Sequence, residues 1–183
     1  MTSNLRLRPY KPCDAEKIVS WCRDEKTFIL WGGDHFGSYP ITPEIMNRKY
    51  LDNNGDCTEC DNFYPMTAFD DEGIVGHFIL RYLNGDNRLL RIGWVIVDDT
   101  KRGRKYGQQM LRLGLEFAFE ILQAETVTIG VFENNAPAYH CYLSAGFRKS
   151  TILEDSVLEI NGEQWKVVEL EMSREDYCNI SVS

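Results

Sequence analysis

The sequence lacks a long apolar run. Across its 183 residues no stretch approaches the ~18 consecutive apolar residues of a membrane-spanning helix. The opening segment MTSNLRLRPYKPCD also lacks the apolar core of a secretory leader. We therefore expect a cytoplasmic protein with no membrane partner.

Positive charge is scarce as well. The chain has 20 Lys and Arg residues against 28 Asp and Glu residues, which gives a net charge of −8. Contacts with nucleic-acid phosphates need a basic face, so we expect no nucleic-acid partner. A composition of 43% hydrophobic and 12% aromatic residues indicates instead a folded domain with a substantial core.

The six cysteines do not form a recognisable framework. Without a leader segment, a set of disulfides is not expected. Cys57 and Cys60 have the spacing of zinc ligands, but a structural zinc site needs four ligands and there is no second such pair. We expect free thiols and no metal, with a redox or adventitious metal role for this pair as the alternative.

The most informative segment is VIVDDTKRGRKYG, residues 95–107. A β-branched run ends in acidic residues, and a basic turn containing Gly103 and Gly107 leads into an amphipathic helical pattern. The first backbone N–H groups of a helix have no partner within it, and the helix dipole places partial positive charge there. The turn is therefore suited to hold a phosphate or pyrophosphate. A dinucleotide-binding turn would need three glycines, and only two are present.

A second motif follows a β-rich segment at residues 125–132. Asn134 or Asn135 can cap a short helix, Pro137 falls in its first turn and Gly146 closes it. Asn135 and Tyr142 are seven residues apart, so both project from one face of that helix.

Together, the two segments resemble the acyl-CoA-binding motifs of the GNAT family of N-acetyltransferases. The first family motif reads Arg/Gln-x-x-Gly-x-Gly/Ala, and Lys105 replaces its first glycine. The second reads Asn-x-x-Ala-x-x-x-Tyr-x-x-x-Gly-Phe, and the chain matches every position with Asn135, Ala138, Tyr142, Gly146 and Phe147. The N-terminal pattern LRLRPYKPCDAEKIVSW resembles the branch related to ribosomal-protein-alanine N-acetyltransferases.

The resemblance implies a mixed α/β fold: a mostly antiparallel sheet of about six or seven strands, with two splayed parallel strands and helices on both faces. It implies one domain over residues 1–183, with a CoA-binding core over about 74–150. We expect strands at 4–9, 64–70, 74–82, 89–98 and 125–132, and helices beginning near Asp14, Thr42, Gly107 and Asn135. Residues 28–42 should be an irregular loop and 53–62 an exposed turn. Residues 147–153 and 164–172 should pair as a hairpin around Asn161-Gly162.

The resemblance also implies the site. Backbone groups of Val95 and Val97 would hold the pantetheine of acetyl-CoA, the co-substrate. The turn residues would surround its pyrophosphate: Arg102, Gly103, Arg104, Lys105, Tyr106 and Gly107. Tyr142 would be the general acid, because a phenol with a pKa of about 10 is protonated at neutral pH. Asn135 would orient the pantetheine or cap the helix.

The sequence assigns no general base. The strand LLRIGWV, residues 89–95, carries no carboxylate, although many relatives have a glutamate there. Residues near the expected site are Asp34, His35, His77, Asp98, Glu133 and His140. Deprotonation of the amine by water needs none of them.

Acetyl transfer to the primary amine of a small molecule or of a peptide N-terminus is the function implied. Aromatic residues are expected to form the acceptor wall: Trp21, Phe28, Trp31, Phe36, Tyr39, Phe63 and Tyr64. The alternatives are a catalytically silent acyl-CoA-binding module and a nucleotide- or phosphate-binding α/β domain. A homodimer could form through Trp165 and Val167.

Overall fold

The structure, a computed structural model, describes residues 4–59 and 61–181. These residues form an eight-stranded mixed sheet in the order β1-β2-β3-β4-β5-β8-β6, and β7 also pairs with β8. The strands are β1 Arg6–Pro9, β2 Phe63–Asp70, β3 Gly73–Leu83, β4 Asp86–Val97, β5 Thr126–Phe132, β6 Arg148–Lys149, β7 Ser156–Ile160 and β8 Glu163–Ser173. The helices are α1 Ala15–Val19, α2 Glu25–Trp31, α3 Pro43–Asn47, α4 Tyr106–Glu116, α5 Ala136–Ala145 and α6 Arg174–Ser181.

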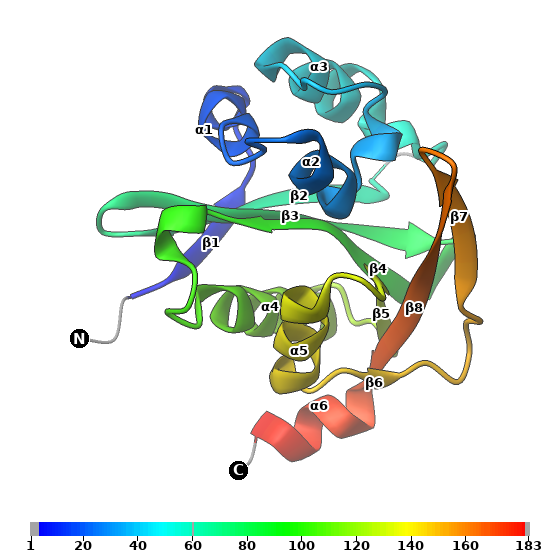
Figure 1. The fold of residues 1–183 in the computed structure, drawn as a ribbon. Helices are drawn as coiled ribbons and strands as arrows, with labels where there is room; N and C mark the ends of the chain where they lie inside the picture. The colour runs from blue at the N-terminus through cyan, green and yellow to red at the C-terminus, as the bar shows by residue number, and fades with distance from the viewer. Residues whose placement is uncertain (1–3, 60, 182–183) are drawn as a thin grey trace.

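Helices cover both faces of the sheet. In Figure 1, α1, α2 and α3 lie over one face, while α4 and α5 lie over the other. Strand alternation divides the core accordingly, since Phe78 and Leu80 pack with the α4 side chains and Ile79 packs with those of α1–α3. The predicted fold class is confirmed. None of the described helices has the length and apolar character needed to span a membrane.

Strands β4 and β5 pair over only a short stretch, so a gap opens between them. These strands are the parallel pair of the sheet, and their register runs only from Leu89–Thr126 to Ile92–Ile129. Beyond this point β4 stays paired with β3, while β5 stays paired with β8. The two strands therefore separate at their carboxyl ends, as the resemblance implied.

A bulge distorts β4 where this separation begins. Ile79 pairs with Gly93, but His77 pairs with Ile96, so two residues of β4 stand opposite one residue of β3 and β4 has one extra residue at this step. Trp94 within the bulge has φ of 48°, a left-handed conformation that is unusual for a bulky side chain. Its backbone carbonyl accepts a hydrogen bond of 2.7 Å from Trp31 Nε1, which fixes α2 against the bulge.

Most predicted elements are confirmed, but the segment 28–42 is not a simple loop. Helix α2 occupies Glu25–Trp31, and a short 3-10 turn follows at Gly33–His35. The side chain of Asp24 caps α2 by accepting the Thr27 N–H at 2.6 Å. The cap at Asp24 lies ahead of residues 28–42, and the glycine and aromatic residues of that stretch are typical of a loop, so the pattern did not predict the helix.

The C-terminal hairpin has a different partner strand from the one expected. The turn at Asn161-Gly162 is where predicted, but it joins β7 to β8. Of residues 147–153, only Arg148 and Lys149 form a strand, and they pair with the far end of β8. Helix α6 was not predicted.

The start of α1 is also built differently. The Asp14 side chain does not cap the helix. It accepts hydrogen bonds from the Arg8 guanidinium at 2.7 and 2.8 Å and from the Thr67 hydroxyl at 2.9 Å. These contacts anchor α1 to β1 and β2, and the Arg8 hydrogen bonds help keep the pKa of Asp14 below its ordinary value despite burial.

Candidate active site

A cavity of about 230 Å³ lies where β4 and β5 separate. The separated strands contribute Trp94 and Val95 from β4 and Gly130 from β5. Helix α5 lines one side, while α2 and the β7–β8 hairpin line the other. The cavity therefore connects the two faces of the sheet, and two molecules could meet in it from opposite sides.

Tyr142 of α5 lines this cavity. Asn135 caps the helix by accepting the Ala138 N–H at 3.4 Å, and Gly146 ends it with φ of 107°. The Tyr142 hydroxyl makes no hydrogen bond with any described residue. Burial raises the pKa of Tyr142 well above its ordinary value, while the nearby Arg91 charge opposes the rise. The phenol is therefore a neutral hydrogen-bond donor at physiological pH.

Asn135 also lines the cavity, so the helix cap and the site share one side chain. Its carbonyl oxygen is used by the cap, which leaves the amide N–H groups for a ligand. The two roles that the sequence allowed for Asn135 are thus compatible.

The basic turn has the features of an anion-binding helix start. Gly103 and Lys105 both have positive φ, 78° and 62°. Arg102, Gly103, Arg104 and Lys105 are exposed, and neither Arg104 nor Lys105 forms an ion pair with a described residue. The first turn of α4 follows, and its N–H groups have no partner within the helix. This end of α4 can therefore hold a phosphate group.

Two side chains of this segment, Lys101 and Tyr106, form hydrogen bonds with Asp70. The Tyr106 hydroxyl donates to Asp70 at 2.7 Å, and Tyr106 is buried. Lys101 also donates to Asp70, at 2.8 Å, and forms an ion pair with Glu72 at 3.0 Å. Burial would raise the pKa of Asp70, but the hydrogen bonds from Lys101 and Tyr106 outweigh it and lower this pKa to about 2. Tyr106 can therefore offer a phosphate only its backbone N–H, not its side chain.

The predicted backbone positions on β4 have different surroundings. Val95 lines the cavity, next to the bulge. Val97 is paired with Gly76 of β3 and lies beside Gly107 of α4. A Cβ at Gly107 would be 3.1 Å from Cys141 Sγ of α5, so this glycine lets α4, α5 and β4 pack closely at the site.

Two of the carboxylates considered as bases, Glu133 and Asp98, are engaged by other groups and do not line the cavity. Glu133 is exposed and pairs with Lys166 at 3.6 Å. Asp98 is buried, accepts both Thr100 hydrogen bonds and has a lowered pKa. The side chain of Asp34 lies outside the described part of the chain.

The three histidines lie in different places. His35 lines the cavity, and its ring is 5.5 Å from that of Trp94. His77 is fully buried and shares a hydrogen bond of 2.7 Å with the Tyr50 hydroxyl. His140 is exposed on α5. Of these, only His35 is at the site.

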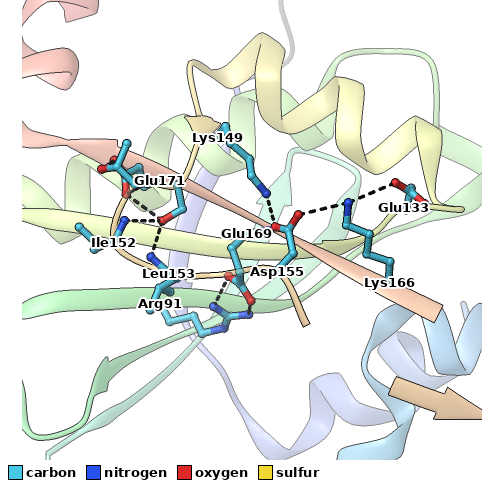
Figure 2. Close-up of polar contacts among 11 residues, drawn as sticks. Arg91, Glu133, Lys149, Ile152, Leu153, Asp155, Lys166, Glu169 and Glu171 are labelled. Carbon is cyan, nitrogen blue, oxygen red and sulfur yellow. Dashed lines mark hydrogen bonds and ion pairs between the residues drawn. The ribbon is translucent and has the colours of Figure 1, made fainter. Parts of the chain in front are cut away.

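Sequence reasoning missed a charged group inside the cavity. The Arg91 guanidinium of β4 donates to both carboxylate oxygens of Glu169 on β8, at 2.7 and 2.9 Å (Figure 2). Their side chains are 20% and 9% exposed. Arg81 of β3 lines the same cavity. The available signal was a single arginine in the otherwise apolar strand LLRIGWV.

The expected acceptor wall is largely core. Trp31 lines the cavity, while Trp21, Phe28, Phe36 and Phe63 are buried in the same core cluster and do not line it. Tyr39 packs at the edge of this cluster. Tyr64 was placed wrongly, because it packs on the opposite face, against Tyr82 and Phe117. Trp94, which the prediction omitted, is the aromatic residue of β4 that lines the cavity.

Two further expectations concern the surface. Trp165 and Val167 are not exposed as expected, because Trp165 packs on Phe132 and Val167 lines the cavity.

Cys57 is half-buried beside Arg81, whereas Cys60 lies outside the described residues. No group of three or more metal-ligating side chains occurs within residues 4–59 and 61–181.

Comparisons with known proteins agree on one family. Residues 4–148 match the model of a family described as an acetyltransferase (GNAT) domain. An N-acetyltransferase 9-like protein of Caenorhabditis briggsae is 25% identical over 171 residues, which cover 86% of this chain and 83% of that protein. A spermine/spermidine N(1)-acetyltransferase of Bacillus subtilis is 26% identical over 121 residues, covering 63% of this chain and 76% of that protein.

A solved structure shows the same fold. The spermidine N-acetyltransferase of Vibrio cholerae, in complex with CoA and spermine, superposes with a TM-score of 0.77 at 19% identity. The superposition covers 96% of this chain and 98% of that chain.

Proposed function

Because this chain belongs to the GNAT acetyltransferase family, we propose that it acetylates the primary amine of a small molecule or of a peptide N-terminus. The chain is an N-acetyltransferase, and acetyl-CoA is its co-substrate. In the proposed mechanism the amine attacks directly, with both substrates bound at once. The observation that carries the proposal is the neutral Tyr142 phenol, buried and without a described hydrogen-bond partner, at the cavity between the separated strands.

The chemistry assigns Tyr142 to the leaving group. The amine lone pair attacks the thioester carbonyl carbon, the amide C–N bond forms and the C–S bond breaks. The departing thiolate takes a proton from the Tyr142 hydroxyl. The amine nitrogen loses its proton to water, and the Tyr142 phenolate takes a proton back from water. The net products are the N-acetyl amide and the free CoA thiol. No buried carboxylate is needed to remove the amine proton.

The same residues would position acetyl-CoA. The first-turn N–H groups of α4, with Arg102, Arg104 and Lys105, would hold the pyrophosphate. Val95 would hold the pantetheine through backbone groups that β5 no longer pairs. Asn135 would donate to it from the opposite wall. Holding the thioester beside the amine in this way is a large part of the rate gain expected of such a site.

Small amines are supported as acceptors by the relatives. The Bacillus subtilis relative is named for spermine and spermidine, which are small primary amines. The cavity, at about 230 Å³, fits an amine-bearing group of modest size. The cytoplasmic location, the homodimer and the absence of nucleic-acid or membrane partners stay predictions from the sequence.

Two measurements test the proposal. Thermal unfolding with acetyl-CoA, ATP or NAD identifies the bound nucleotide, and only acetyl-CoA should raise the Tm strongly. Release of free CoA thiol is then followed with a panel of amines. Amine-dependent release supports the proposed function. Stabilisation by acetyl-CoA without turnover of any amine would instead indicate an acyl-CoA-binding module, and stabilisation only by ATP or NAD would reject the acyl-CoA site.

A further inference from the structure

Two arginines, Arg81 and Arg91, line the cavity from the face of the sheet that α1, α2 and α3 cover. Along β3 and β4, Leu80 and Leu90 belong to the core cluster that includes the α4 side chains. Because side chains alternate along a strand, Arg81 and Arg91 project to the other face, which α1, α2 and α3 cover. The two arginines are direct partners in the antiparallel register of β3 and β4.

The charges of this pair are only partly balanced. Arg91 is bound by Glu169 through two hydrogen bonds. Arg81 forms no ion pair with a described residue, and its guanidinium lies beside Cys57. Like charges directly opposite each other on two strands destabilise a sheet. Among the described side chains that line the cavity, two arginines therefore face one carboxylate, which leaves a surplus of one positive charge.

We propose that the acceptor is a small amine that also carries a carboxylate near its amino group, such as an amino acid, and that Arg81 and Arg91 bind this carboxylate. This inference rests on the proposed function. A guanidinium presents a planar set of donors that matches a carboxylate. With the acceptor bound, two arginines face two carboxylates and the half-buried charges are balanced.

The position of Arg91 connects this carboxylate to the reacting groups. Arg91 and Tyr142 line the same cavity, and the Arg91 charge acts on the Tyr142 hydroxyl. A carboxylate held at Arg91 would therefore place a neighbouring amine close to the proposed leaving-group acid. A polycationic amine would instead bring further positive charge to a site that already has a surplus.

The test compares amines that differ only in the carboxylate. Each amino acid is compared with its carboxamide, in which an uncharged amide replaces the carboxylate. Spermidine is included as a polycationic amine. The amide has the less basic amine, so simple reactivity at neutral pH favours it. The inference predicts the reverse order, with kcat/KM at least ~10-fold higher for the amino acid.

The Arg81→Gln variant assigns the preference to this residue. It should raise the KM for the amino acid about 10-fold, change kcat little and leave the KM for acetyl-CoA unaltered. Arg88→Gln is the matched control, since Arg88 is an exposed arginine of the neighbouring strand β4 that forms an ion pair with Asp86 and does not line the cavity. Because Arg91→Gln would leave Glu169 buried without its partner, the double variant Arg91→Gln/Glu169→Gln replaces it as the second test. This pair should lose the carboxylate preference while still binding acetyl-CoA.

The outcomes separate this inference from the proposed function. Turnover of spermidine or of the amides at rates equal to or above those of the amino acids would overturn the inference and leave the proposed function standing. Unchanged selectivity in Arg81→Gln would also overturn it. Absence of turnover with every amine would overturn both.

Discussion

Arg91 of β4 and Glu169 of β8 are joined by two hydrogen bonds, 2.7 and 2.9 Å long, although β5 lies between their strands. Gly130 of β5 makes this contact possible. A Cβ placed there would be 2.4 Å from Arg91 Nη2 and 3.2 Å from Glu169 Oε1. The glycine leaves the space through which the two side chains meet at the cavity (Figure 2).

Replacing Gly130 by alanine should therefore displace the ion pair. We expect Gly130→Ala to lower the free energy of unfolding by about 1–3 kcal/mol, because the added methyl group overpacks a buried contact. Urea denaturation measures this loss. The stability control is Gly93→Ala on β4, where a Cβ would make an ordinary contact of 3.5 Å with Ile79. Equal stabilities of the two variants would contradict this account of the ion pair.

Lys105 should be strained by its conformation. Its φ of 62° lies in the left-handed region, which costs an ordinary residue about 1–2 kcal/mol and glycine almost nothing. Lys105→Gly should therefore be about 1 kcal/mol more stable than Lys105→Ala, as measured by denaturant titration. Both variants lose the same charge.

If the Lys105 ammonium contacts a phosphate, both variants should bind acetyl-CoA about two- to fivefold more weakly at low salt. The difference from wild type should shrink as salt is added. Affinities that differ between the glycine and alanine variants would mean that the shape of the turn matters more than this charge.

His77 should make the fold sensitive to mild acid. Burial lowers the pKa of His77 to about 3, so the unfolded chain binds a proton there at higher pH than the folded chain does. Stability from this group is complete above about pH 6.5 and falls by about 1.4 kcal/mol per pH unit as pH drops toward 3. The lowered pKa of Asp70, about 2, acts only at the acid end of this range.

The substitution His77→Gln tests this origin, since glutamine can still hydrogen-bond Tyr50 but does not titrate. Unfolding free energies of the variant and of wild type are compared from pH 7 to pH 4.5. The variant should show a distinctly flatter decline. Parallel curves would assign the acid sensitivity to other groups.

No single carboxylate should be essential for removing the amine proton. Glu133→Gln is expected to retain turnover, with kcat/KM still rising with pH as more of the amine becomes neutral. Steady-state kinetics between pH 6.5 and 9 measure this. A fall of about a thousandfold in kcat, with acetyl-CoA binding unchanged, would identify a dedicated base.

The helix that carries Tyr142 was predictable because its signals are local. Asn135 begins it, Pro137 is compatible with its first turn and Gly146 ends it, all within a short stretch of sequence. The start of α4 was found in the same way, from a strand, a glycine-containing turn and an amphipathic pattern. Where the pattern alone was ambiguous, the resemblance to the family supplied the chemistry.

The acceptor side was not predictable, because its contacts depend on the order of the strands. Arg91 and Glu169 are 78 residues apart and meet only because β5 and β8 are neighbours in the sheet. Nothing local to either residue reports this order. The hairpin was misassigned for a related reason: residues 147–153 alternate like a strand, yet only two of them find a place beside β8.

The role of Tyr142 is the central claim, and Tyr142→Phe tests it most directly. The substitution removes one hydroxyl and keeps the buried ring, so acetyl-CoA affinity and Tm should change little. We predict that kcat for amine-dependent CoA release falls about 100-fold. Because burial keeps the phenol protonated, the wild-type rate should show no loss from this group below about pH 10. A variant that binds acetyl-CoA normally and retains the full wild-type kcat would contradict the account.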